Sequence, residues 1–222
     1  MLDKLNELFE SSTIKPTFDY VHIILALIMF GKNPEGIGRY RLQKELMIGS
    51  GTARSLIKKL NEIGNFITIS DQNKRRGHIL TEEGLEFLKK IKKKIPLLEK
   101  GDLKILKDII IENKNAYAYF CLIKKASTKL KSGIEQRDAA IKVNGSGATC
   151  LIYYDNVLKL PSSPILENKE VLNLSTNLQK YFKIRISDNN VELEVGDVII
   201  IGLGDTQEKA RLAALNSALT LI

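Results

Sequence analysis

Hydroxyl and cationic side chains gather in one short stretch of this 222-residue sequence, between residues 50 and 59. At helical spacing they would share one solvent-facing side, while the apolar residues between them would face a core. These side chains donate hydrogen bonds to phosphate oxygens, and arginine also donates to base edges. The chemistry that the pattern indicates is recognition of a polyanion. The residues concerned are Ser50, Thr52, Arg54, Ser55, Lys58 and Lys59.

The apolar residues of the same stretch predict the element that carries it. They recur at helical spacing through residues 51–63, which predicts a helix with one core-facing stripe. Ser50 is the expected N-cap, and Gly49 is expected to supply the positive φ of a sharp turn before it. The expected stripe is Ala53, Leu56, Ile57, Leu60 and Ile63.

Residues at the start of this helix and residues further along it are expected to contact different parts of the DNA. The N-terminal residues of a recognition helix reach base edges, so Thr52, Arg54 and Ser55 are the candidates for base or phosphate contact. Lys58 and Lys59 lie further along and are expected to neutralise phosphates. The alternative is an ordinary solvated helix face.

A second helix is predicted just before the turn, at Arg39–Leu46. Its apolar residues Tyr40, Leu42 and Leu46 can face a core. Arg39 and Arg41 then remain outside and join the candidate DNA-binding residues.

A basic hairpin is predicted after the second of these helices. Residues 66–69 have strand composition and residues 78–80 return, with Lys74, Arg75 and Arg76 in the turn between them. Three adjacent cations repel one another, which is tolerable where a phosphate backbone supplies counter-charge. Helix, tight turn, helix, strand, basic turn and strand form the outline of a winged helix-turn-helix.

Two flanking helices complete the N-terminal half. Residues 17–30 are nearly all apolar, which predicts a largely buried helix. Thr81 is expected to cap another helix, whose role as dimer contact, bridge or connector stays open. Its expected apolar stripe is Leu85, Leu88, Ile91 and Ile95.

Gly101-Asp102 is the expected boundary between domains 1–100 and 101–222. In the second domain, strands interleaved with helices indicate an α+β or mixed α/β fold. Helices are predicted over residues 103–111, 133–143, 171–182 and 206–221. Strands are predicted over residues 115–123, 150–154, 157–160, 191–194 and 198–201.

Two glycine-bearing segments of this domain are candidate anion sites. Residues 199–206 read as strand, glycine loop and helix start, where free backbone N–H groups can bind an anion. Residues 144–149 follow Arg137, which could hold a phosphate or carboxylate, or pair with Asp138 or Glu135. Asp205 could instead cap the last helix, and a sensing pocket would require both segments to converge. The candidates are Arg137, Asp138, Gly145, Gly147, Thr149, Gly202, Gly204, Asp205 and Thr206.

The charge is concentrated in the N-terminal half. The whole chain carries +8, and residues 1–100 hold 18 Lys or Arg against 12 Asp or Glu, whereas residues 101–222 hold 16 against 14. This asymmetry fits a nucleic-acid reader joined to a second module, or ordinary solubilising lysines. Cys121 and Cys150 lack metal-binding spacing and read as buried thiols of a reducing compartment. The apolar run 21–30 is too short for a bilayer and no signal peptide is recognisable, so a cytoplasmic location is expected.

The segment from Gly38 to Gly84 resembles archaeal winged helix-turn-helix regulators, through the residues 38–42, 49–56 and 80–84. The second half is similar to an archaeal C-terminal domain of unassigned function, through residues 133–140 and 145–149. Together these resemblances imply a dimeric archaeal transcriptional regulator with an uncharacterised sensing domain.

The function expected from the sequence is therefore a sequence-specific regulator that binds double-stranded DNA. Its C-terminal domain is expected to bind a small anionic effector or to mediate homodimerisation, with no membrane partner. No cofactor, metal site or catalytic set is expected. Two alternatives stay open, which are a nucleotide- or phosphate-metabolite enzyme with a winged-helix appendage, and a protein–protein adaptor.

Overall fold

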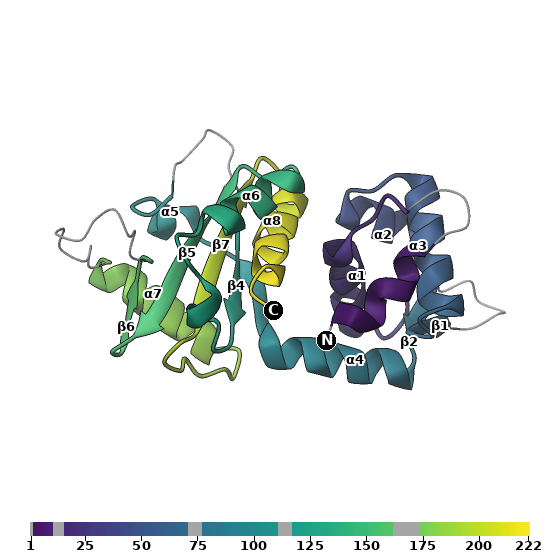
Figure 1. Cartoon of the computed structure of the whole chain (residues 1–222), viewed down its shortest axis with the longest axis horizontal. Helices are drawn as coiled ribbons and strands as arrows, with labels where there is room; N and C mark the ends of the chain where they lie inside the picture. Colours follow the sequence, from purple (N-terminus) through teal and green to yellow (C-terminus); the bar gives the residue numbers. More distant parts are fainter. Residues whose placement is uncertain (1, 11–15, 71–76, 111–116, 162–173) are drawn as a thin grey trace. The chain divides into compact units, whose positions relative to one another are not determined.

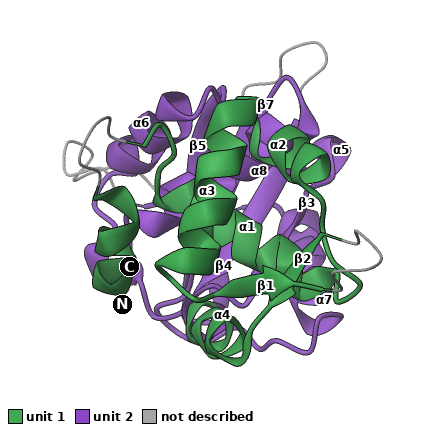
Figure 2. Cartoon of the chain, turned by 90° about the vertical axis from the view of Figure 1, so that its right-hand side faces the viewer, with its two compact units in different colours: residues 1–91 green, residues 92–222 purple. Residues whose placement is uncertain are grey.

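The chain forms two compact units, residues 1–91 and residues 92–222 (Figure 2). The computed structural model describes residues 2–10, 16–70, 77–110, 117–161 and 174–222. The division between the units falls inside a helix rather than at Gly101-Asp102, because residues 97–100 form a strand of the second unit's sheet.

Unit 1 is mainly helical, and its second helix is its apolar centre (Figure 1). Val21 and every residue from Ile23 to Phe30 are buried, which explains why this helix has no polar face in the sequence. The elements are η1 (Leu2–Phe9, a 3₁₀ helix), α1 (Tyr20–Lys32), α2 (Arg39–Leu46), α3 (Ser50–Glu62), β1 (Ile67–Ile69), β2 (His78–Leu80) and α4 (Glu82–Lys94).

The core of unit 1 differs from the predicted stripes at three residues. Tyr40 is 75% exposed because it lies on the outer side of α2, whereas Leu42 and Leu46 are buried as predicted. Ile63 follows the last residue of α3 and is also exposed. On α4, Leu85 is exposed and Phe87 takes its place in the core, where it stacks on Phe66 at 5.0 Å between ring centroids.

Unit 2 is built on one five-stranded sheet in the order β3-β4-β7-β5-β6, and all neighbouring strands are antiparallel. The α+β character predicted for the chain is thereby confirmed. The elements are β3 (Leu97–Lys100), α5 (Leu103–Leu106), β4 (Tyr117–Ile123), η2 (Ser127–Lys129), α6 (Ile134–Lys142), β5 (Gly147–Tyr154), β6 (Val157–Lys159), α7 (Thr176–Ser187), β7 (Val198–Gly204) and α8 (Gln207–Leu219).

Helices cover both faces of this sheet (Figure 1). On one face, α5 and α7 close a core in which Phe120 packs edge-on against Phe182 at 5.3 Å. On the other face, α8 packs on β7 and β4, and α6 packs on β5 and α8. The central strand β7 is buried along its whole length, which is why its sequence is a continuous apolar run.

Three predicted elements of unit 2 differ from the structure. Residues 191–194 are not a strand, because the chain there turns back toward β7 through Glu194 to Asp197. The helix predicted from Leu103 ends at Leu106, and the one predicted over residues 171–182 runs from Thr176 to Ser187. Strand β3 was not predicted at all, since only its pairing with β4 distinguishes it from a connector.

The two cysteines are buried, as predicted, on the α8 face of the sheet. Both are cross-strand neighbours of Ile200, Cys121 on β4 and Cys150 on β5. Two strand spacings of roughly 4.8 Å separate them, which exceeds the reach of a disulfide. Burial raises the pKa of the Cys121 thiol strongly and that of Cys150 to about 12, so both are chemically inert at neutral pH.

A buried carboxylate holds the turn that leads into β7. Asp197 is fully buried and accepts hydrogen bonds from the backbone N–H groups of Lys125 (2.9 Å) and Glu194 (2.8 Å). The Lys124 ammonium donates to the same carboxylate at 2.7 Å. Burial alone would lower the pKa of Lys124, but its contacts with Asp197 and Glu194 raise it. The network joins the end of β4 to the start of β7.

We expect Asp197→Ala to lower the free energy of unfolding of unit 2 by about 3 kcal/mol, because it leaves the backbone N–H groups of Lys125 and Glu194 without their buried acceptor. Asp197→Asn keeps an acceptor and is expected to cost less. Glu194→Gln, at the exposed end of the network, is the control and is expected to cost under about 1 kcal/mol. Denaturant titration measures all three, and an Asp197→Ala midpoint equal to that of Glu194→Gln would contradict this account.

Candidate nucleic-acid interface

The turn between α2 and α3 sets the direction of the candidate recognition helix. Met47 ends α2 in the left-handed region, at φ 55°, and its N–H group bonds to the last carbonyls of α2. The prediction that Gly49 supplies the positive φ is therefore wrong, since Gly49 has φ −67°. The chain has already reversed at Met47, so extended backbone suffices at Gly49.

Helix α3 begins at Ser50, with Gly49 as its N-cap. The predicted capping role of Ser50 is therefore wrong, because the helix starts one residue earlier than the apolar pattern suggested. Ser50 is exposed in the first turn, next to the free N–H groups of the helix. It remains a candidate for an anion contact through a different geometry.

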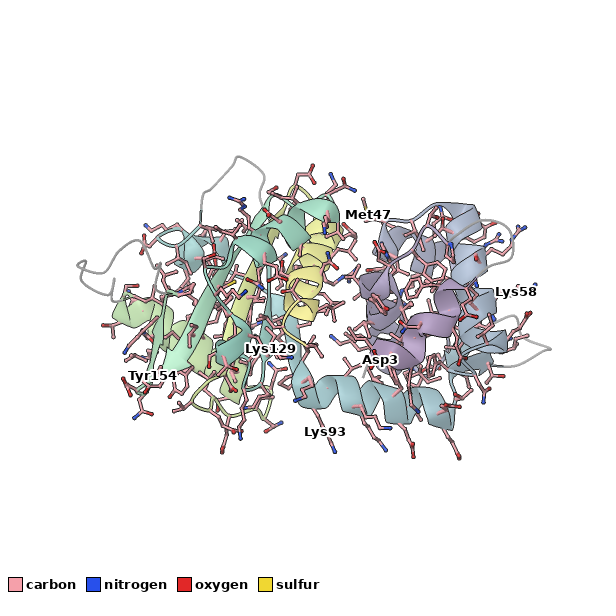
Figure 3. All side chains as sticks on the ribbon, in the orientation of Figure 1. Asp3, Met47, Lys58, Lys93, Lys129 and Tyr154 are labelled. Carbon is pink, nitrogen blue, oxygen red and sulfur yellow. The ribbon has the colours of Figure 1, made fainter. Side chains whose placement is uncertain are left out.

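The outer face of α3 carries the predicted cations. Arg54 and Lys58 are exposed, and Lys58 projects from α3 away from the rest of unit 1 (Figure 3). Arg54 makes no ion pair with any residue that the structure describes. Lys58 lies 3.7 Å from Glu62, and exposed pairs of this kind contribute about 0.3–0.5 kcal/mol. Both side chains are thus available to an external anion.

Two predicted contact residues of α3 also hold the helix in place. The Thr52 hydroxyl lies 2.6 Å from that of Thr17, and the Lys59 ammonium donates to the Glu10 carbonyl at 2.6 Å. Lysine has three N–H donors, so this bond leaves two for a phosphate. Ser55, like Thr52 and Lys59, is partly exposed on the same helix.

The start of α2 carries further candidate contact residues, two arginines with a tyrosine between them. The Arg39 guanidinium lies over the Tyr40 ring, 5.0 Å from its centroid, and Arg41 is exposed one residue further along. Stacking on the ring restrains the guanidinium while leaving its N–H donors on the surface.

The hairpin after α3 is fixed at its base. β1 pairs antiparallel with β2, and the Ser70 N–H donates to the Gly77 carbonyl at 3.0 Å. Ile37, just before α2, forms an antiparallel bridge with His78 through two hydrogen bonds of 2.9 and 3.0 Å. Gly77 has φ 95°, and a Cβ atom there would lie 2.3 Å from the Ile37 carbonyl oxygen. Lys74, Arg75 and Arg76 lie outside the described residues.

The predicted glycine loop of unit 2 is strand rather than loop. Gly202 and Gly204 are the buried end of β7. A Cβ atom on Gly202 would lie 2.1 Å from the backbone nitrogen of Ala214, and one on Gly204 would lie 2.6 Å from that of Ala210. The two glycines therefore let the backbone of α8 lie directly against the strand.

The other candidates of unit 2 meet through backbone pairing and not around a cavity. Gly147 pairs with Leu203, and the Ser146 N–H donates to the Leu203 carbonyl at 2.7 Å. Gly145 makes another close contact, with Ala213 of α8. The two predicted segments do converge, but the sheet and α8 occupy the space between them.

Polar candidates in the same region have partners within the fold. The Arg137 guanidinium pairs with Asp138 at 2.9 Å, one of the two alternatives left open for it. The Thr149 hydroxyl donates to the Ile109 carbonyl at 3.2 Å. Thr206, and not Asp205, caps α8 by accepting from the Lys209 N–H, while Asp205 pairs with the Lys209 ammonium at 2.8 Å. These contacts leave no preformed anion site among them.

Comparison with known protein families finds one match within unit 1 and one match within unit 2. Residues 21–86 match the family described as "PH0730-like, N-terminal domain", and residues 114–221 match the "Domain of unknown function (DUF4443)". A solved structure, "Hypothetical protein PH0730 from Pyrococcus horikoshii OT3", matches with a TM-score of 0.64 and 26% identity, covering 92% of this chain and 93% of that chain. The chain is similar to an archaeal protein over most of its length.

The two matches follow each other along the chain, which fits a two-domain layout. No curated protein matches the chain. Among the described residues, none of the helices has the length and apolar character that spanning a membrane requires.

The two histidines of unit 1 are kept neutral by burial, which lowers the pKa of both. The His22 ring nitrogen Nδ1 accepts the Asp19 N–H at 2.9 Å at the start of α1, a bond that only the neutral ring can make. His78 lies at the base of the hairpin and pairs with Ile37.

We expect the thermal midpoint of unit 1 to fall as the pH drops from 7.5 to 5.5. The histidines have an ordinary pKa of 6.5 when unfolded and a lower one when folded. Around and below pH 6.5 the unfolded state therefore binds more protons than the folded state, so the free energy of unfolding decreases as the pH falls. A His22→Gln/His78→Gln double variant should flatten this dependence in thermal melts. An unchanged slope in the double variant would show that other groups are responsible.

We expect Gly202→Ala to lower the free energy of unfolding of unit 2 by about 3 kcal/mol, because α8 must move away from β7 to admit the methyl group. Gly51→Ala is the matched control, since an added Cβ there meets nothing within 4 Å. It should leave stability unchanged or raise it by up to about 1 kcal/mol, because alanine favours helix. Chemical denaturation compares them. A Gly202→Ala protein as stable as the wild type would remove the packing explanation for this glycine.

Proposed function

We propose that the chain is a transcription regulator that binds double-stranded DNA through a winged helix-turn-helix in unit 1. The observation that carries the proposal is the outer face of α3. It presents exposed Arg54 and Lys58 beside the hydroxyls of Thr52 and Ser55, on a helix whose opposite side is buried. A helix with this face fits the major groove, where arginine can read guanine and lysine can neutralise phosphate.

The hairpin beside α3 supports the same interpretation. A winged helix carries a small sheet whose turn extends the DNA contact beyond the recognition helix. Here β1, β2 and the bridge residue Ile37 supply the base of such a sheet, and the segment that they close contains Lys74, Arg75 and Arg76. We propose that this segment is the wing and contacts the phosphate backbone.

The charge of this region favours a polyanionic partner. Residues 39–76 hold nine Lys or Arg and three Asp or Glu. Each phosphate neutralised by such a cation releases counterions, so binding must weaken steeply as salt is raised. We further propose that the chain acts as a homodimer, because one recognition helix reads a single half-site and paired half-sites need two.

The alternative of a phosphate-metabolite enzyme has weaker support. Its expected glycine loop is occupied by β7 and α8, and its expected anion-binding Arg137 is paired with Asp138. Neither of the two anion sites expected from the sequence is therefore open.

The test is binding of the full chain to fluorescently labelled DNA fragments selected from a random pool, across a salt series. Arg54→Ala should weaken binding to the selected sequence by about 1–3 kcal/mol and relax its sequence preference. Lys58→Ala should weaken selected and random DNA alike and reduce the salt slope by about one unit. Fluorescence anisotropy measures both effects.

Lys89→Ala is the matched control, because Lys89 is also an exposed cation of unit 1 but lies on α4. Thermal melts establish that all three variants fold. If Arg54→Ala and Lys58→Ala bind DNA with the affinity and salt slope of Lys89→Ala, the face of α3 is not the DNA contact and the proposal fails.

A further inference from the structure

Unit 2 has a surface hollow that no sequence motif marked. It has a volume of about 550 Å³, within the range of roughly 300–1,000 Å³ typical of small-molecule sites. Its walls come from the end of β3, the start of α5, the start of β4 and one side of α7. The lining residues are Lys100, Gly101, Asp102, Leu103, Lys104, Tyr117, Tyr181 and Arg185.

The ionised side chains of the lining favour an anion. Three cations, Lys100, Lys104 and Arg185, line the hollow together with one carboxylate, that of Asp102. That carboxylate is already engaged, since it accepts the Lys104 N–H at 2.9 Å. The ammonium groups of Lys100 and Lys104 make no ion pair with any described residue. They are the free charges of the hollow.

Arg185 is held in place but keeps one unused donor. Its Nη2 atom donates to the Glu99 carboxylate at 2.6 Å, which fixes the guanidinium between α7 and β3. Its Nε atom is buried and has no hydrogen-bond partner among the described residues. That atom has almost no exposed surface, so a ligand in the hollow meets the accessible part of the Arg185 side chain, which is 40% exposed.

Two aromatic rings complete the lining. Tyr117 and Tyr181 are half-buried, and the Lys100 ammonium lies 5.8 Å from the centre of the Tyr117 ring. The Tyr181 hydroxyl is fixed by the Asp102 N–H at 2.9 Å. Restrained rings of this kind stack against planar groups.

A second hollow in unit 2 lacks this combination. It lies around the start of α6, has a volume of about 590 Å³ and mixes Lys131 and Lys142 with Glu135 and Asp138. Its charges balance and it has no aromatic lining residue. It therefore favours neither an anion nor a ring.

We propose that the hollow at Lys100, Lys104, Tyr117, Tyr181 and Arg185 binds a small anion that carries a planar ring, of the type of a nucleoside monophosphate. The phosphate lies against the two lysines and the exposed part of the Arg185 side chain, and the ring stacks on tyrosine. The role of this ligand as an effector rests on the proposed regulatory function, whereas its binding does not. Only two residues separate the end of α4 from the start of β3, and Lys100 is the last residue of β3. A ligand bound at Lys100 therefore acts on a strand that is directly connected to α4.

The test is calorimetric titration of the full chain with adenosine monophosphate, adenosine and inorganic phosphate. We expect the monophosphate to bind at least tenfold more tightly than either fragment, because only it engages cations and rings together. A Lys100→Gln/Lys104→Gln double variant should weaken that binding about tenfold or more. Lys107→Gln is the matched control, since Lys107 is an exposed lysine just after α5 that does not line the hollow. It should bind as the wild type does.

Two results would overturn the site. One is the absence of binding heat for the monophosphate, and the other is equal affinity in the double variant and in Lys107→Gln. DNA anisotropy on the same preparations separates the two proposals. Loss of the nucleotide site with intact DNA binding overturns only this inference, and nucleotide binding without DNA binding overturns only the proposed function. A DNA affinity that the monophosphate leaves unchanged would overturn the effector role.

Discussion

The close approach of backbone to backbone at β7 and α8 is the constraint on which unit 2 depends. Gly202 and Gly204 leave no space for a Cβ atom between the strand and the helix, so α8 lies directly on the centre of the sheet. The helix consequently buries nearly every residue from Ala210 to Ala218, which are mostly alanine and leucine. Small side chains on one side and missing side chains on the other give a contact that larger residues could not reproduce. The same contact removes the glycines from any anion-binding role.

A similar restriction positions the hairpin of unit 1. Gly77 lies against the Ile37 carbonyl with a backbone conformation that side chains disfavour, so the return strand is attached to the start of α2. Thr81 strengthens the far end, because its hydroxyl accepts the Gly84 N–H at 3.0 Å and begins α4. The position of the return strand relative to the start of α2 is therefore set by backbone hydrogen bonds.

Periodicity predicted the elements that have one apolar side. The predicted bounds of α3, residues 51–63, differ from the observed bounds by one residue at each end, and four of its five predicted core residues are buried. Tyr40 misled because a ring that is apolar enough for a core is also suited to stacking beneath Arg39 on the surface. At β3 the pattern failed for another reason. Four residues between a proline and a glycine carry little signal, and only pairing with β4 makes them a strand.

The candidate sites show where sequence reasoning fails. A glycine-rich strand–helix junction has the same sequence pattern whether its glycines make room for a phosphate or for another stretch of backbone. In this protein they make room for the backbone of α8. The hollow could not be found in this way because Lys100, Tyr117 and Arg185 come from β3, β4 and α7, with no fixed spacing between them. What brings them together is the antiparallel order of the sheet, which places β3 beside β4, and the packing of Leu178, Phe182 and Ile186 of α7 in the core, which brings Arg185 to Glu99. The electrostatic character of the hollow is thus a product of topology, whereas that of α3 can be read along a single helix.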